Sequence, residues 1–283
     1  MDVDVIHCYE DAEADRETIN TITDNCYLPA NEIILSQVNE YHGKFKLSYS
    51  ISGTLLEQLQ QYRTDVIDSF KALTARGCVD ILGETYYRSL SWLHSRKEFQ
   101  RQVFKHSNVV KDLFNIEPTV FRNTELIYNN NLAVFIAGLG FKGVLCEGVK
   151  RVLNDKTVNK VYAAPDTIDF GLLLINATLS DDIAFRFGDS NWSEHPLTAD
   201  KFAEWINAHP ADAEVINPFM DYETIGIHKK ADSGIFDFSK ALPQAVLKNS
   251  DFTFNTATEV LDIHYLKDIY NVPKTISWDD NEQ

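Results

Sequence analysis

An alternation of short β-rich runs with longer stretches of helical periodicity constrains the fold of this sequence more than any other feature. Residues 45–51 alternate like a strand, and residues 53–76 then repeat apolar side chains at three- and four-residue steps. The same order returns in a strand at 78–83 and a helix at 96–114. Strands that alternate with helices form βα units around a largely parallel sheet. The sequence therefore predicts an α/β fold.

The remaining elements extend this pattern to most of the chain. Residues 1–28 are acidic and weakly patterned, so no first strand is predicted there, and one edge of the sheet is expected to be open. The Thr198 hydroxyl is expected to cap the helix that follows it. Further helices are predicted at 30–41, 131–139, 199–208 and 236–249, and further strands at 118–124, 141–147, 170–175, 183–187 and 214–220.

Length and composition fit one soluble barrel domain over residues 1–283. A chain of 283 residues with 44% hydrophobic residues can bury a sizeable core, and it contains no repeat or linker. The net charge of −16 opposes binding to nucleic acid or anionic lipid. No apolar run approaches the roughly 20 residues that span a bilayer, and no signal peptide is evident. We therefore expect a cytoplasmic protein without nucleic-acid or membrane partners, whose oligomeric state remains open.

The cysteines and histidines indicate neither a disulfide framework nor a metal site. Cys8, Cys26, Cys78 and Cys146 are far apart and form no CxxC motif, so we expect reduced thiols. Metal-dependent barrel deacetylases use an HxxxH pattern with paired aspartates, whereas this sequence has no HxxxH and only the isolated pair at 181–182. We predict no metal and no cofactor.

Two predicted strands end in acidic residues. The apolar run at 214–220 leads to Asp221 and Glu223, which a strand would place on one side at its exit. The run at 118–124 leads to Glu125. In a barrel of parallel strands this end carries the active site, and two carboxyl groups about 5–5.5 Å apart can cleave a glycosidic bond with retention. The simpler alternative is that each acid caps a helix or pairs with an arginine.

The segments around these acids, 123–128 and 219–226, closely resemble two signature segments of glycoside hydrolase family 57, the α-amylase and 4-α-glucanotransferase family. The resemblance runs in order from about residue 20 to residue 278 and is closest to the bacterial α-amylase-like branch. Further matching segments lie at 26–31, 45–53, 77–90, 179–187 and 193–198.

The resemblance implies an incomplete seven-stranded β/α barrel and a retaining mechanism on α-linked glucans. It places Glu125 on the nucleophile of the family, Asp221 on its general acid/base and Glu223 on a substrate or orienting contact. Arg122 or Asn123 can favour the ionised form of the nucleophile. Burial and the charge of Glu223 would raise the pKa of Asp221, which must hold a proton before bond cleavage.

Five further residues are candidate substrate contacts. Asp80 falls on an acid of the second signature of the family. Trp192 and Tyr222 are flanked by polar residues and can stack on sugar rings, although core packing is the more common role of an aromatic residue. His195 and His228 lie close to matched motifs and can bond sugar hydroxyls, although a single histidine is more often structural.

The sequence also departs from the family pattern. Family members carry a His-Gln-Pro motif on their first strand, but no such motif precedes Glu10, where His7 stands alone. The given sequence also stops at Gln283, whereas family members continue into a helical bundle. Asp80 replaces a Glu, and Arg88 stands where His is common. An alternative function is therefore a catalytically weak α-glucan-binding or regulatory protein. The sequence does not separate hydrolysis from glucosyl transfer.

Overall fold

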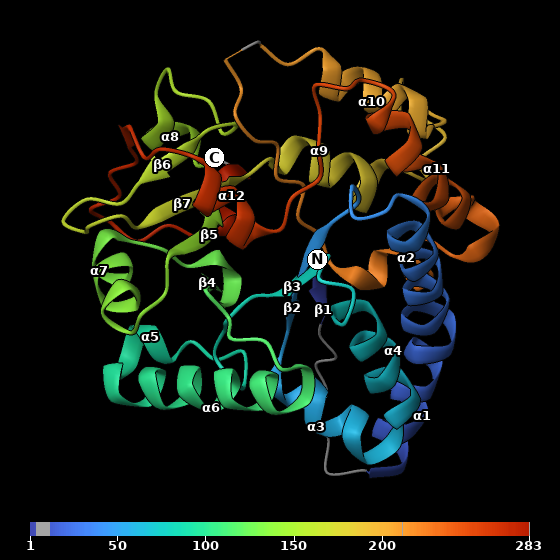
Figure 1. Ribbon diagram of the computed structural model, residues 1–283, viewed down its shortest axis with the longest axis horizontal. Helices are drawn as coiled ribbons and strands as arrows, with labels where there is room; N and C mark the ends of the chain where they lie inside the picture. Colours follow the sequence, from blue (N-terminus) through green and yellow to red (C-terminus); the bar gives the residue numbers. More distant parts are fainter. Residues whose placement is uncertain (4–11, 211, 283) are drawn as a thin grey trace.

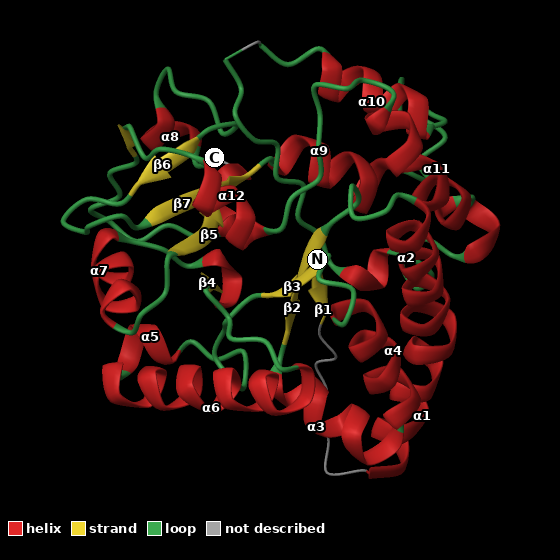
Figure 2. Ribbon diagram, in the orientation of Figure 1, coloured by secondary structure: helices red, strands yellow, loops and turns green. Residues whose placement is uncertain are grey.

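The computed structural model describes residues 1–3, 12–210 and 212–282, and it places helices around most of the strands (Figures 1 and 2). One sheet has the order β1–β2–β3 and the other the order β4–β5–β7–β6–β8. Neighbouring strands run parallel except for β6 and β7. The strands are β1 (Asp2–Val3), β2 (Leu47–Ile51), β3 (Val79–Ile81), β4 (Val120–Arg122), β5 (Gly143–Glu147), β6 (Val161–Ala163), β7 (Gly171–Ile175) and β8 (Asp268–Ile269).

The helices connect these strands and cover their outer faces. The α-helices are α1 (Ala12–Ile22), α2 (Leu28–Glu40), α3 (Gly53–Tyr62), α4 (Thr64–Thr74), α5 (Ser91–His94), α6 (Arg96–Phe114), α7 (Asn130–Gly138), α8 (Lys150–Leu153), α9 (Ala177–Asp181), α10 (Ala199–Asn207), α11 (Ile235–Leu247) and α12 (Ala257–Ile263). Two π-helical turns are η1 (Thr23–Tyr27) and η3 (Asp182–Arg186), and the 3₁₀ turns are η2 (Thr124–Leu126), η4 (Tyr222–Thr224), η5 (Ala231–Ser233) and η6 (Trp278–Glu282).

Residues 1–3 supply a first strand, so the prediction that the chain begins without one is wrong. β1 pairs in parallel with β2, and Asp2 lies opposite Ser50. On its other side, the Asp2 amide donates to the Met220 carbonyl at 2.9 Å, and a parallel bridge joins Asp2 to Asp221. Two strand residues are too few to produce an alternating pattern, which explains why this strand is not predicted from the sequence. The edge of β2 is covered, and not open as expected.

A parallel bridge connects the two sheets between β3 and β4. The Gly83 amide donates to the Val120 carbonyl, and the Arg122 amide donates to the Gly83 carbonyl, both at 2.8 Å. The strands from β1 to β4 therefore follow one another in space as they do in the sequence. Their carboxyl ends point in one direction because each pairing is parallel.

The extended segment before Asp221 is not the buried strand predicted at 214–220. Its residues belong to no strand, and their side chains are exposed or only partly buried. The Asn176 amide, just after β7, donates to the Asn217 carbonyl at 2.9 Å, so the segment runs from the end of β7 to β1. Pro218 lacks the amide hydrogen that a strand ladder needs, which explains why regular pairing does not form.

The amino ends of the strands are covered by α12. A buried apolar cluster between the sheets extends into this helix, whose axis lies in front of the strands in Figure 1. A Cβ atom at Gly143 or Gly171, the first residues of β5 and β7, would lie 2.5 Å from the Leu261 side chain. The carboxyl ends lie at the opposite side. The buried members of this cluster are Leu82, Val120, Leu126, Leu145, Val161, Leu173, Ile175 and Val260.

Most predicted helices are confirmed, and two of them have the caps that their sequences indicate. The Ser95 hydroxyl accepts from the Glu98 amide at 3.3 Å at the start of α6. The predicted cap at Thr198 accepts from the Lys201 amide at 3.2 Å at the start of α10. The helices α2, α7 and α11 and the strands β2, β3, β4, β5 and β7 lie within the predicted segments or within a few residues of them.

Two other predictions of secondary structure are wrong, and one capped helix was not predicted. The helix predicted at 53–76 breaks at Arg63, whose φ of −144° and ψ of 65° are not helical. The strand predicted at 183–187 is the π-helical turn η3, which continues α9. The helix α12 was not predicted, although Thr256 and Glu259 form a capping box at its start.

Two predictions from composition can be compared with the described residues. The thiols of Cys26, Cys78 and Cys146 are free and buried, as expected, and Cys8 lies outside the described residues, as does His7. Within the described part of the chain, the helices are too short or too polar to cross a bilayer.

Candidate active site

Glu125 lies directly after the carboxyl end of β4, in the short turn η2. Its backbone has a φ of 55° and a ψ of 22°, in the left-handed region that non-glycine residues seldom adopt. The Asn123 side-chain amide donates to the Ile127 carbonyl at 3.0 Å and closes the turn around Glu125. The Glu125 side chain is half-buried. Backbone strain of this kind occurs often at functional sites, and here it directs one acid to the end of the strand.

The indole N–H of Trp278 donates to the Glu125 carboxylate. Trp278 begins η6, and 48% of its surface is exposed. Trp278 is not recognisable as a site residue from the sequence, because 153 positions separate it from Glu125. The polar tail around it gave no periodic signal.

Asp221 lies beside β1, and its side chain is exposed to solvent. Partial desolvation and the negative charge of Asp2 raise the pKa of Asp221 above its usual value. The positive charges of Arg88, Arg122 and His228 oppose this rise in pKa. Asp221 is thus accessible to solvent, and its protonated form is more favoured than in an ordinary aspartate, as a general acid requires. Asp2 is the acid that raises this pKa most, where the sequence had suggested Glu223.

Four charged side chains form an ionic cluster beside Asp221: Asp2, Glu84, Arg88 and Arg122. The Arg122 guanidinium pairs with Asp2 and lies 3.5 Å from Glu84. Arg88 lies 3.1 Å from Asp2. Asp2, Glu84 and Arg122 are each at most 3% exposed. Since buried charges are stable only when they are paired, this cluster fixes the carboxyl ends of β1, β3 and β4 relative to one another.

A buried histidine of α6, His106, lies next to Glu84 of this cluster. His106 is inaccessible to solvent, and burial lowers its pKa to about 4, so the ring is neutral. Its Nε2 lies 2.8 Å from the Ile51 carbonyl, which can only accept, so this nitrogen carries the proton. Its Nδ1 then accepts from the Glu84 amide at 3.4 Å. His106 therefore ties the end of β2 to the loop that carries Glu84.

Glu223 is buried, and its carboxylate accepts from the Tyr27 hydroxyl. Burial is the main cause that raises the pKa of Glu223 to about 8. The prediction that Asp221 and Glu223 lie on one side of a strand is wrong, because the 3₁₀ turn η4 replaces the period of two. Asp221 is exposed, whereas Glu223 is 7% exposed. Glu223 therefore faces the protein interior and Tyr27, and solvent scarcely reaches it.

We expect Glu223→Gln to reduce the pH dependence of stability. The folded chain keeps the Glu223 proton up to a pH of about 8, whereas the unfolded chain loses it near the ordinary pKa of a glutamate, 4.5. An acid with a raised pKa in the folded state favours folding at low pH, so its contribution is lost as pH rises between these values, by at most about 1.4 kcal/mol per unit. Gln keeps the acceptor for Tyr27 but does not titrate.

Urea unfolding of both chains at pH 5 and pH 8 measures this effect. The wild type should lose about 2–4 kcal/mol more than Glu223→Gln between these two pH values. An equal loss in the two proteins would mean that the pKa of Glu223 is not raised in the folded chain and that its burial has no such effect.

Tyr222 cannot stack on a sugar in this structure, so that prediction is wrong. The side chain is inaccessible to solvent, and its ring stacks on Tyr27 with centroids 6.0 Å apart. Its hydroxyl donates to Asn31 at 2.7 Å and lies 3.2 Å from the hydroxyl of Tyr49. The polar neighbours of Tyr222 in the sequence suggested exposure, but its buried hydroxyl is satisfied by other buried polar groups.

Asp80 lies toward the amino ends of the strands, away from the other candidates. Its carboxylate accepts from the Thr258 hydroxyl and, at 3.3 Å, from the Thr258 amide in the first turn of α12. Burial raises the pKa of Asp80, and these hydrogen bonds oppose the rise. Asp80 therefore anchors the first turn of α12. Its position does not support the substrate contact that the sequence suggested.

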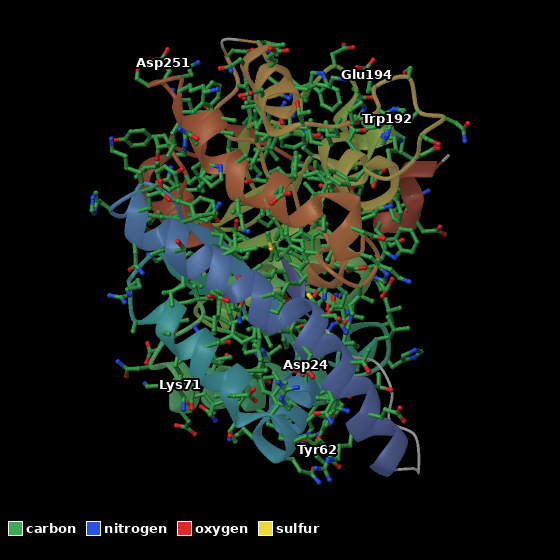
Figure 3. The ribbon with its side chains drawn as sticks, turned by 90° about the vertical axis from the view of Figure 1, so that its right-hand side faces the viewer. Asp24, Tyr62, Lys71, Trp192, Glu194 and Asp251 are labelled. Atoms are coloured by element: carbon green, nitrogen blue, oxygen red, sulfur yellow. The ribbon has the colours of Figure 1, made fainter. Side chains whose placement is uncertain are left out.

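The remaining candidates lie on two loops. His228 follows the Asp221 turn, is exposed, and its amide donates to the Glu223 carbonyl at 2.9 Å. Trp192 and His195 lie on the loop before α10. Figure 3 shows Trp192 near the margin of the molecule, and its ring packs against Trp205 with centroids 5.8 Å apart. The structure brings His228 close to Asp221, whereas the sugar contacts of Trp192 and His195 stay predictions.

The arrangement of acids and arginines at the carboxyl ends of the strands can be compared with known proteins. The model of the family described as Glycosyl hydrolase family 57 matches residues 2–273. The chain belongs to glycosyl hydrolase family 57. The match includes both predicted catalytic acids, so the resemblance seen in the sequence is confirmed.

Relatives of this family 57 chain are found in both sequence and structure. A curated protein of Methanocaldococcus jannaschii, provisionally named an alpha-amylase, is 40% identical over 278 residues, which are 97% of this chain and 58% of that protein. The 4-alpha-glucanotransferase of Thermococcus litoralis superposes with a TM-score of 0.77 at 15% identity, over 98% of this chain and 41% of that one. A family 57 branching enzyme of Thermococcus kodakaraensis superposes with a TM-score of 0.73 at 10% identity, over 98% of this chain and 72% of that one.

These likenesses confirm the predicted α/β fold with mostly parallel sheets, which is consistent with the incomplete seven-stranded β/α barrel that the resemblance implies. This family 57 chain spans 58% of the length of the curated relative and 41% of the glucanotransferase. That residues 1–283 form a single domain stays a prediction.

Proposed function

We propose that this chain acts on α-linked glucans as a retaining glycoside hydrolase or glucanotransferase, with Glu125 as nucleophile and Asp221 as general acid/base. The observation that carries the proposal is the position of two acids in a family 57 barrel. Glu125 follows the carboxyl end of β4, and Asp221 is bridged to β1 at the same end of the strands. Active sites of parallel barrels lie at this end.

The environments of the two acids fit the two roles. Glu125 is half-buried and accepts a hydrogen bond from the Trp278 indole, which holds its side chain at the carboxyl end of β4. Asp221 has a raised pKa and is accessible, which favours a proton that can be given to a leaving group. Arg88 and Arg122 stand close enough to Asp221 to stabilise its charge after the proton has left.

The proposed reaction has two steps. A Glu125 oxygen attacks the anomeric carbon of a glucosyl unit while the glycosidic C–O bond breaks, and the Asp221 proton passes to the leaving oxygen. A water molecule or a sugar hydroxyl then gives its proton to Asp221 and attacks the anomeric carbon, which releases Glu125. Water gives hydrolysis, and a sugar hydroxyl gives transfer. Each step inverts the anomeric carbon, so the intermediate is β-linked to Glu125 and the product regains the α configuration.

The substrate class is supported by the names of the relatives and by charge. The similar proteins are named as an alpha-amylase, a 4-alpha-glucanotransferase and a branching enzyme. The net charge of −16 disfavours polyanionic substrates and is compatible with uncharged glucans. Maltooligosaccharides and amylose are therefore the substrates to test first.

We expect Asp221→Asn to slow the release of products from maltooligosaccharides by about 10²–10⁴-fold, because an amide cannot supply the proton that the leaving sugar needs. The first release of fluoride from α-glucosyl fluoride, before the glycosyl-enzyme is hydrolysed, should be slowed much less, since fluoride leaves without protonation. Parallel assays of the two substrates with purified wild type and variant measure this difference.

An equal loss on both substrates would contradict the acid/base role of Asp221. Proton NMR of the first product formed by the wild type tests the stereochemistry, and an initial β anomer would contradict retention. Binding of maltooligosaccharides by the wild type without any turnover would refute the enzyme and support the alternative, a glucan-binding protein.

A further inference from the structure

Residues 271–280 form a strap that crosses the turn containing Glu125. The Tyr128 amide donates to the Ile276 carbonyl at 3.0 Å, and the Ile276 amide donates back at 2.9 Å. The Asn129 side chain donates to the Thr275 hydroxyl at 2.8 Å. The Asn130 amide donates to the Val272 carbonyl at 3.0 Å. The strap is therefore tied to the residues that immediately follow η2.

The far end of the strap is also held in place. Arg151 of α8 lies 2.6 Å from Asp280, and the Asp280 carboxylate accepts from the Ser277 amide at 2.8 Å. Trp278 lies between these contacts and the Tyr128 pairing. Its indole is thus delivered to Glu125 by a segment that is fixed on both sides.

The placement of Trp278 differs from that of a core residue. Ile276 and Tyr270 are each 1% exposed and anchor the strap region in the apolar core. Trp278 is 48% exposed, and its polar atom contacts the carboxylate of Glu125. The strap is therefore not held in place by burial of the indole ring. The specific contact of Trp278 is the hydrogen bond from its indole N–H to Glu125.

We propose that Trp278 is a positioning residue that holds the Glu125 carboxylate in the orientation for attack. The inference rests on the proposed function of Glu125 as nucleophile. The side chain of Glu125 has several rotatable bonds and projects from a turn, so without a fixed donor its oxygens would sample several orientations. A hydrogen bond from a fixed indole selects one of them, and small errors in the position of a reacting group are costly.

Kinetics of three variants test this role. Trp278→Phe removes the N–H and keeps an aromatic ring, and we expect kcat on maltooligosaccharides to fall by about 10–100-fold with KM changed less than about twofold. Trp278→His keeps a donor and should recover part of kcat. Trp205→Phe, in a tryptophan that packs against Trp192 and Phe202, is the matched control and should retain kcat.

A second measurement tests the contact without turnover. In a ¹⁵N-labelled chain, the indole signal of Trp278 is assigned by its loss in Trp278→Phe. Glu125→Ala should move this signal, whereas Glu117→Gln, in an exposed acid paired with Lys111, should leave it in place. Thermal unfolding of all variants controls for loss of folding.

The outcomes separate the inference from the proposed function. A full kcat in Trp278→Phe, or an indole signal that does not respond to Glu125→Ala, would overturn the role of Trp278. If the wild type turns over no glucan, the proposed function fails. The indole signal then still tests the contact between Trp278 and Glu125. An unmoved signal refutes this contact, and a moved signal supports it.

Discussion

Glu125→Gln should reduce turnover of maltooligosaccharides on the order of 10⁴–10⁶-fold while the chain still folds and binds its substrate. An amide has the shape of the carboxylate but is too weak a nucleophile to attack the anomeric carbon. It can still accept the hydrogen bond from Trp278, so the turn η2 should keep its conformation. Initial rates, with thermal unfolding beside them, measure the effect.

The matched control for this change is Glu117→Gln. Glu117 lies just before β4, its side chain is 73% exposed, and it pairs with Lys111 on the surface. This variant should turn over substrate at the wild-type rate. If Glu125→Gln retained more than a few per cent of the wild-type rate, Glu125 would not be the nucleophile.

Arg122→Met should destabilise the fold by about 3–5 kcal/mol. Arg122 is 3% exposed and is the partner of two buried acids, Asp2 and Glu84. Met fills a similar volume but leaves these acids without their main positive neighbour, and removal of one partner from a buried pair is strongly destabilising. We expect the midpoint of thermal unfolding to fall by roughly 6–12 °C at pH 7.

Arg101→Met provides the comparison for a surface pair. Arg101 lies 2.6 Å from Glu98 on α6, and its side chain is 55% exposed. Solvent screens such a pair, so its loss should leave the unfolding midpoint almost unchanged. Equal effects of the two substitutions would show that the ionic cluster does not hold the strand ends together.

The elements that the sequence predicted correctly have strong periodic patterns. The helix α6 spans 19 residues with an apolar stripe and a Ser cap, and both of its ends match the prediction. The strands β5 and β7 are mostly apolar and buried on both faces, as in a parallel sheet. The alternation of strands and helices predicted the largely parallel sheet, and the family resemblance predicted the barrel.

The parts that the sequence did not predict depend on contacts between distant residues. β1 is two residues long and is recognisable only through its pairing with Ser50 and Asp221. Asp80 was assigned to the site, but its carboxylate is bonded to Thr258, which is 178 positions away. Trp278 has no local signal, and its contact with Glu125 exists only in the folded chain.

The candidate site shows the same division. The motif around Glu125 located this acid at a strand end, because the sequence shows where an apolar run stops. Asp221 instead follows an extended segment that forms no strand and is bridged to β1. The motifs did not show that η4 would separate Asp221 from Glu223, since a 3₁₀ turn of three residues has little sequence signature. They also gave no indication that Tyr222 would be buried against Tyr27.

The most direct test of a covalent route through Glu125 is to trap the intermediate. A 5-fluoro-α-glucosyl fluoride forms the glycosyl-enzyme faster than water can hydrolyse it, so the labelled protein accumulates and can be digested for mass spectrometry. The added mass of one fluoroglucosyl unit should be found on the peptide that contains Glu125 and should be absent in Glu125→Gln. A label on another residue, or turnover of this reagent without any labelled protein, would contradict the proposed nucleophile.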